Sequence, residues 1–391
     1  MYQKYVDKLR AVLNEQYVKV CLFSGFRQVG KTTAVSHLLR QLDWNYYVVN
    51  AESKGNVLFW TEQVIHTAKL KFNQDKERKF LLVIDDFHKF EHQMDVIKSL
   101  VLSVSEIPSI KILLVGTSGP RLQQFQEENT LENFKTIRMG HIGFNSTQIE
   151  FGLSFERHLY FGAFPGGLEM MEEEDRWRHF IKQNVIEQGF LRDVLSQSRV
   201  DKPNLIRQLF ELGIRYNGKI VALNKLMSEL PGAGNTSTLS HYLDTLESAG
   251  LLGRIEKYTG EQNRIRASKP KLLLYTSAIL TASQETNFQQ ILFDYKEWFK
   301  VIHAALGAHL LNGAFEQEFE LYYWQDGEHY VDFVLKKGTE LVAIELKGER
   351  FGRNKGLENF KAQFKPTKSF LIGTGGISLE EFISMSPVEL F

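Results

Sequence analysis

One nine-residue stretch has the residue types and the spacing that bind a chain of phosphates. Residues 25–33 are GFRQVGKTT, which fits the pattern GxxxxGKT. Gly25 and Gly30 would let the backbone turn tightly and bring its N–H groups within reach of phosphate oxygens. Lys31 would reach the β- and γ-phosphates as a mobile charge, and the hydroxyl of Thr32 would bind a magnesium ion. The stretch therefore predicts a MgATP site, and its expected nucleotide-contacting residues are Gly25, Arg27, Gln28, Val29, Gly30, Lys31, Thr32 and Thr33.

Two later apolar runs end in side chains that such a site needs. Residues 80–86 are FLLVIDD, and a further run, IKILLVGTS, ends in Thr117 and Ser118. Strands of a parallel sheet are continuous apolar runs, and ligands bind at their carboxyl ends. We expect Asp85 to hold the magnesium ion, Asp86 to orient the attacking water, and Thr117 or Ser118 to contact the γ-phosphate or that water. The alternative is that the acids begin a solvated loop and the hydroxyls cap a turn.

A third group of polar residues lies near the C-terminus. Asp332 stands in the run YVDFVL, and Glu345 and Lys347 stand in LVAIELK. Strand alternation places Glu345 and Lys347 on one face. This spacing resembles that of PD-(D/E)xK nucleases, in which two carboxylates bind magnesium and the lysine acts on water beside the scissile phosphate. The alternative is an edge strand on which acids and lysines simply alternate.

One residue argues against cleavage by this third group. His303 stands where the nuclease pattern has a helical glutamate. Histidine is a poor magnesium ligand, because hard cations prefer oxygen. We therefore favour a domain that binds DNA or a partner without cutting over an active nuclease.

Length and composition limit the alternatives. The 391 residues suffice for two to three domains of about 150 residues each. Lys+Arg and Asp+Glu both number 47, which removes any global electrostatic argument for nucleic-acid binding. The single cysteine, Cys21, lies in an apolar run and cannot form an internal disulfide. No apolar run reaches about 18 residues and no signal peptide is recognisable, so we expect a soluble, cytoplasmic protein without membrane association.

The elements that must position these residues follow from periodicity. Alternating buried strands and amphipathic helices over residues 1–150 predict an α/β fold with a parallel P-loop sheet. A helical lid is expected at 151–200, a winged helix-turn-helix at 201–270 and a smaller α/β, nuclease-like domain at 271–391.

The winged-helix prediction rests on three helical patterns and a strand between residues 205 and 258. Its third helix exposes acids, Asp244 and Glu247, which would repel DNA phosphates, so we favour a structural or protein-contact role. A basic cluster follows, which would either touch nucleic acid or form a solvated loop. It comprises Lys257, Arg264, Arg266, Lys269 and Lys271.

The order of GFRQVGKTT, LLVIDD and LLVGTS resembles the AAA+-type ATPase domain. Within that class it is similar to prokaryotic ATP-binding proteins that continue into a C-terminal domain of unknown function. The likeness extends to the YFGAFPG segment after the ATPase core and to the strands that carry Asp332 and Glu345. Two departures stand out. Asp86 replaces the family's usual glutamate, and no Gly-Arg pair ends the core, which leaves Arg138 as a weak candidate for a trans-acting arginine.

The resemblance implies ATP and Mg²⁺ as cofactors and a homo-oligomer as one assembly. The main hypothesis is an ATPase that couples its nucleotide state to the C-terminal module. One alternative is an ATP-regulated protein that binds or cleaves DNA or RNA. The other is a non-hydrolysing, nucleotide-gated module for a protein partner, which is favoured if Asp86 cannot support hydrolysis.

Overall fold

The computed structural model describes residues 2–51, 57–90, 92–105, 107–129, 131–189, 194–195, 200–260, 269–316, 319–348 and 355–391. The described residues divide into two compact units, one up to Met139 and one from Gly140 onward. Within the described ranges, no helix combines the length and apolar content that crossing a bilayer requires.

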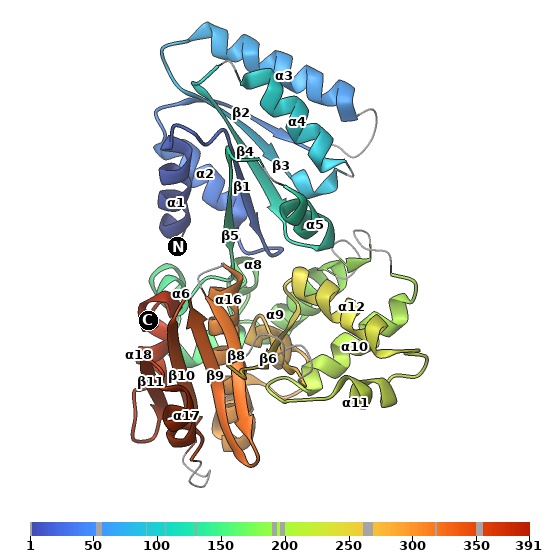
Figure 1. Cartoon of the computed structure of the whole chain (residues 1–391), viewed down its shortest axis with the longest axis vertical. Helices are drawn as coiled ribbons and strands as arrows, with labels where there is room; N and C mark the ends of the chain where they lie inside the picture. Colours follow the sequence, from blue (N-terminus) through green and yellow to red (C-terminus); the bar gives the residue numbers. More distant parts are fainter. Residues whose placement is uncertain are drawn as a thin grey trace. The chain divides into compact units, whose positions relative to one another are not determined.

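The first unit is built on a five-stranded sheet in the order β2-β3-β4-β1-β5 (Figure 1). All four neighbouring pairs are parallel. The strands are β1 (Val20–Gly25), β2 (Asn45–Asn50), β3 (Phe80–Asp85), β4 (Ile110–Thr117) and β5 (Phe134–Met139). The helices are α1 (Gln3–Asn14), α2 (Lys31–Gln41), α3 (Val57–Gln74), α4 (Gln93–Val104) and α5 (Pro120–Glu128), with a 3-10 turn, η1 (Phe87–Lys89).

Helices cover both faces of this sheet, which explains the continuous apolar runs. Every residue of β1 and of β4 is buried. Val20 and Leu22 belong to a core shared with α3 and α4, whereas the ring of Phe23 packs against Tyr5 of α1. Because β4 separates β1 from β3, the carboxyl ends of these three strands lie side by side. The predicted α/β fold with a parallel P-loop sheet is confirmed for this unit.

The second unit joins helices to a six-stranded sheet in the order β11-β10-β9-β8-β6-β7 (Figure 1). Its strands are β6 (Leu252–Lys257), β7 (Lys271–Leu274), β8 (Glu320–Asp326), β9 (His329–Lys337), β10 (Glu340–Lys347) and β11 (Lys368–Gly373). The first helices are α6 (Phe144–Phe151), α7 (Phe155–Phe161), α8 (Pro165–Leu168) and α9 (Glu174–Phe180), followed by a π-helix, η2 (Ile181–Glu187). Three more are α10 (Pro203–Arg215), α11 (Leu223–Ser228) and α12 (Thr236–Ser248). The last are α14 (Ser277–Ala282), α15 (Phe288–Phe293), α16 (Tyr295–Phe315), α17 (Gly356–Phe364), α18 (Leu379–Ser384) and η4 (Pro387–Leu390).

The segment predicted as a winged helix has the expected order of elements: α10, α11, α12 and then β6. Strand β6 pairs antiparallel with β7 and parallel with β8. The strand expected to form the wing is therefore part of the large sheet, and the predicted boundary at residue 270 falls between two paired strands. Assignment of this segment to the winged-helix class stays a prediction.

Candidate functional site

The loop between β1 and α2 has the backbone that a phosphate cradle needs. Gln28 and Gly30 adopt positive φ angles of 60° and 100°. A Cβ atom on Gly25 would lie 2.4 Å from the carbonyl oxygen of Met139, on the neighbouring strand. Glycine is therefore required at Gly25 by the close approach of a second backbone, and at Gly30 by its left-handed conformation.

The N-terminus of α2 and one ammonium group face this loop. The residue that precedes the helix, Gly30, has no side chain with which to cap it. Lys31 is buried, and its Nζ donates hydrogen bonds to the carbonyl oxygens of Gly25 and Phe26, at 3.0 and 2.6 Å. Helix N–H groups without a capping side chain, the helix dipole and a nearby cation together favour an anion at this position.

Two oxygen-bearing side chains meet beside the loop. The hydroxyl of Thr32 donates to the Oδ2 atom of Asp85 at 3.1 Å, although the two residues are 53 positions apart. The other carboxylate oxygen of Asp85 accepts the N–H of Asp86 at 2.8 Å. A hydroxyl and a carboxylate next to a phosphate cradle are the protein ligands that Mg²⁺ takes in nucleotide sites. These residues therefore fit the cofactors that the sequence predicts.

Asp86 is held in an unusual conformation by its neighbours. Its φ of 58° is left-handed, which is uncommon for a residue other than glycine. Its carboxylate forms an ion pair with Lys89. Burial is the largest single cause and acts to raise the pKa of Asp86. The hydrogen bond from Lys89 and the charges of Lys89, His88 and Arg27 together outweigh it, so the pKa lies below its usual value. The carboxylate is thus ionised and partly engaged, and its role in orienting water stays a prediction.

Thr117 reaches the same edge of the sheet at the end of β4, paired with Gly25 of β1. Its backbone N–H donates to Nδ1 of His88, at 3.1 Å. Burial, the largest cause, lowers the pKa of His88 to about 4, so the ring is neutral at neutral pH. His88 is not among the residues that the sequence pattern predicts for this site. Its only local indication is its place two residues after Asp86.

The remaining predicted contacts in the loop differ in exposure. Val29 is fully buried, so only its backbone is left to contact a nucleotide. Thr33 is exposed on the first turn of α2. Arg27 is half-buried, and its charge contributes to lowering the pKa of both Asp86 and His88. Arg27 therefore lies near the strand-end groups as well as in the loop.

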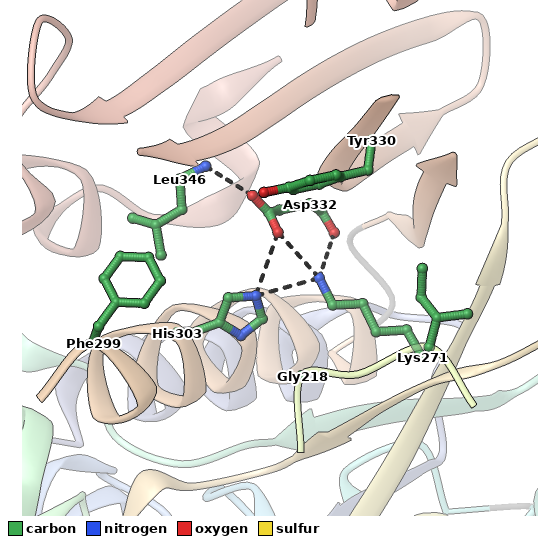
Figure 2. A pocket seen from close by; sticks show the side chains of 8 residues that line it. Gly218, Lys271, Phe299, His303, Tyr330, Asp332 and Leu346 are labelled. Carbon is green, nitrogen blue, oxygen red and sulfur yellow. Dashed lines mark hydrogen bonds and ion pairs between the residues drawn. The ribbon is translucent and has the colours of Figure 1, made fainter. Parts of the chain in front are cut away.

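A second polar cluster lies in the second unit, where three side chains point toward one another (Figure 2). Nζ of Lys271 lies 3.1 Å from the carbonyl oxygen and 3.4 Å from Oδ1 of Asp332. Nε2 of His303 lies 3.4 Å from both that Nζ and that Oδ1. The other carboxylate oxygen of Asp332 accepts the N–H of Leu346, at 3.0 Å.

The two acids of the nuclease-like motif engage different partners. Glu345 accepts the N–H of Leu357, in the first turn of α17, at 3.2 Å. Burial, and to a lesser extent the charge of Asp332, raise the pKa of Glu345. Lys347 is half-buried on the same strand, and its charge acts to lower the pKa of Glu345. The acids thus lie within electrostatic reach of each other. Among the residues that the structure describes, no group of three or more His, Cys, Asp or Glu is placed to hold a metal.

The assignment of Lys271 to an exposed basic cluster is wrong. Its side chain is only 4% exposed, because β7 is paired with β6 and the ammonium is directed at Asp332. Lys269, two residues earlier, is exposed as predicted. Arg264 and Arg266 of the same cluster lie outside the described residues.

A cavity of about 270 Å³ opens next to this second cluster. Aromatic and aliphatic side chains form its walls, namely Phe299, Tyr330, Ile220 and Leu346. Its polar side is made by Lys271, His303 and Asp332 (Figure 2).

Three family models match successive parts of the chain. Residues 17–147 match an AAA domain. Residues 152–290 match a domain of unknown function, DUF8612, and residues 302–390 match another, DUF4143. No curated protein matches the chain. Together with the five-stranded parallel sheet, these matches give an AAA-type P-loop ATPase domain at the N-terminus, followed by domains whose function is unknown.

Proposed function

We propose that the first unit binds MgATP, hydrolyses it, and passes its nucleotide state to the second unit. The observation that carries this proposal is the hydrogen bond between Thr32 and Asp85 beside the loop that bears Lys31. It brings a hydroxyl, a carboxylate and an ammonium to the edge of the sheet where ligands of parallel α/β folds bind.

Each residue has a separate task in this proposal. The loop N–H groups and the N-terminus of α2 hold the phosphates. Lys31 exchanges its hydrogen bonds to backbone carbonyls for bonds to the β- and γ-phosphates. Thr32 and Asp85 hold Mg²⁺, which would neutralise charge on the phosphates. Asp86, released from Lys89, orients the attacking water.

The test is ATP affinity and phosphate release by the full chain, with and without DNA or RNA. Lys31→Ala should weaken ATP binding about 10- to 100-fold, because a hydrogen bond to a charged group is worth about 1.5–3 kcal/mol. Lys76→Ala, which removes an exposed lysine after α3, is the matched control and should leave affinity unchanged. Equal ATP affinity in the Lys31→Ala and wild-type chains would refute the proposal.

The conformation of Asp86 favours a second candidate, a nucleotide-gated binding module without turnover. The side chain of Asp86 is one methylene shorter than that of glutamate, and its carboxylate is paired with Lys89. Under the first candidate, Asp86→Asn should lower phosphate release at least 100-fold, while ATP binding persists. Under the second, the wild-type chain binds MgATP tightly and releases no phosphate under any condition.

A further inference from the structure

The ammonium of Lys271 in the second cluster is surrounded by acceptor atoms in the way that a bound cation is. An ammonium has three N–H donors and no acceptor. Three acceptors surround this one: the carbonyl oxygen and Oδ1 of Asp332, and Nε2 of His303, all within 3.4 Å. With His303 neutral and its proton on Nδ1, each N–H has one acceptor. The face of the Phe333 ring, 4.5 Å away, adds a cation–π contact.

The same three atoms are a set that a metal ion would accept. A carboxylate oxygen, a carbonyl oxygen and an imidazole nitrogen together suit first-row divalent cations. We propose that the ammonium of Lys271 is the resident cation of this site, a covalently tethered substitute for a divalent metal ion. This inference goes beyond the proposed ATPase function and does not depend on it.

An irregularity in the sheet directs Asp332 toward the ammonium. Tyr322 pairs with Val334 and Trp324 with Val331, so the register shifts by one residue between them. Asp332 and Phe333 therefore both lie opposite a single residue of β8, as in a β-bulge. A bulge re-aims side chains, and these two neighbours accordingly both contact Lys271.

The backbone around Gly218 positions the other two members. Its N–H donates to the carbonyl oxygen of Leu272 at 2.7 Å, next to Lys271 on β7. Gly218 has a φ of 78°, and a Cβ there would lie 2.7 Å from Nδ1 of His303. This close approach holds the imidazole ring against the chain that carries the lysine.

The charges of the cluster balance only when Lys271 is present. Asp332 is buried, and burial lowers the pKa of His303, which keeps the ring neutral. Removing the lysine would leave the buried carboxylate without a counter-charge, an arrangement that proteins avoid. A divalent cation could then take the vacated position, using the oxygen and nitrogen atoms that now surround Nζ.

The experiment measures Mn²⁺ binding to the full chain without nucleotide, by electron paramagnetic resonance. Lys271→Ala should bind one Mn²⁺ at least tenfold more tightly than the wild-type chain, and Mn²⁺ should raise the melting temperature of this variant. Adding Asp332→Asn should abolish the gain. Lys271→Arg keeps a cation and should behave like wild type. The proposal is overturned if folded Lys271→Ala binds no more Mn²⁺ than wild type. Asp332-dependent Mn²⁺ binding by the wild-type chain would also overturn it.

A second measurement needs no variant at Lys271. Reductive methylation of the wild-type chain, mapped by mass spectrometry, compares Lys271 with exposed Lys269, which lies two residues before it and outside β7. A resident ammonium predicts that Lys271 is modified at least tenfold more slowly than Lys269, with or without Mn²⁺. Equal rates, or faster modification of Lys271 in the presence of Mn²⁺, would show that the ammonium of Lys271 is not the resident cation of this site.

Discussion

Replacing Lys271 with methionine tests how the second unit tolerates a buried charge. The two side chains of the ion pair are only 4% and 9% exposed, and Nζ lies 3.4 Å from Oδ1 of Asp332. Methionine fills a similar volume but leaves the carboxylate without its cation. Removing one partner of a buried pair costs about 3–5 kcal/mol, mainly because the remaining charge is uncompensated. We therefore expect Lys271→Met to destabilise this unit by that amount.

Scanning calorimetry of the full chain is the assay. Because the chain has two units, the midpoints of its transitions are compared rather than a single free energy of unfolding. At about 2–4 °C per kcal/mol for a unit of this size, the midpoint should fall by on the order of 10 °C. Lys269→Met removes an exposed lysine nearby and should change the midpoint by about 2 °C or less.

The pH dependence of the defect identifies its cause. In the wild-type chain burial acts to raise the pKa of Asp332. The charge of Lys271, together with smaller contributions from His303 and the N–H of Leu346, outweighs burial and holds that pKa below its usual value. The stability that this carboxylate contributes is present above its unfolded pKa, about 3.9, and is lost as the pH falls through the folded pKa. Without Lys271 burial dominates and the folded pKa rises above the unfolded one. The defect of Lys271→Met should therefore shrink as the pH falls from 7 toward 5.

A double variant provides the refuting result. Lys271→Met combined with Asp332→Leu removes both charges and should be more stable than Lys271→Met alone, because no buried charge remains. The reasoning fails if the two substitutions are additive, or if Lys271→Met shifts the midpoint no more than Lys269→Met does.

Three further predictions concern the first unit. Thr32→Ala should weaken ATP binding about tenfold in Mg²⁺ and leave it unchanged in EDTA, as measured by calorimetric titration; equal losses in both would argue against a metal-binding hydroxyl. Burial lowers the pKa of His88 to about 4, whereas in the unfolded chain it is about 6.5. The neutral ring therefore contributes about 3 kcal/mol to the free energy of unfolding above pH 6.5, and this contribution is lost as the pH falls toward 4. His88→Asn should flatten this part of the stability–pH curve in denaturant titrations, and an unchanged slope would contradict the assignment. Gly25→Ala should destabilise the first unit by about 1–3 kcal/mol, because its Cβ would lie 2.4 Å from the carbonyl oxygen of Met139. Gly143→Ala, in the second unit and with no atom within 4 Å of the added Cβ, is the control and should leave the melting transition of the first unit unchanged.

The geometry of the candidate nucleotide site was largely predictable, because its residues obey local rules. A strand, a glycine-rich turn and a helix are consecutive in the chain, so Gly25 and Lys31 could be assigned from spacing alone. Asp85 is distant in sequence, yet the carboxyl ends of parallel strands share one edge of a sheet. That rule places Asp85 near Thr32 once both strands are recognised, and the structure has their side chains 3.1 Å apart.

The conformation of single residues at this site was not predictable. The ion pair between Asp86 and Lys89 and the hydrogen bond from Thr117 to His88 depend on a left-handed turn that follows β3. No pattern of apolar residues specifies such a turn when the residue is an aspartate. Asp86 directly precedes η1, whose Phe87 and His88 are buried, so this turn forms together with the core of the unit.

The amino-acid sequence by itself determined an α/β P-loop domain, its glycine-rich loop, and the two buried strands that end near Asp85 and Thr117. Only the tertiary structure decided the second cluster, in which Lys271, His303 and Asp332 come from β7, α16 and β9. Strand alternation predicts which face a side chain occupies only while the register is regular, and the register of β8 and β9 shifts at Asp332. The residue type likewise shows that Lys271 carries a charge. That its ammonium is buried beside an acid 61 residues away cannot be seen from the residue type. A contact of that range exists only after the chain has folded.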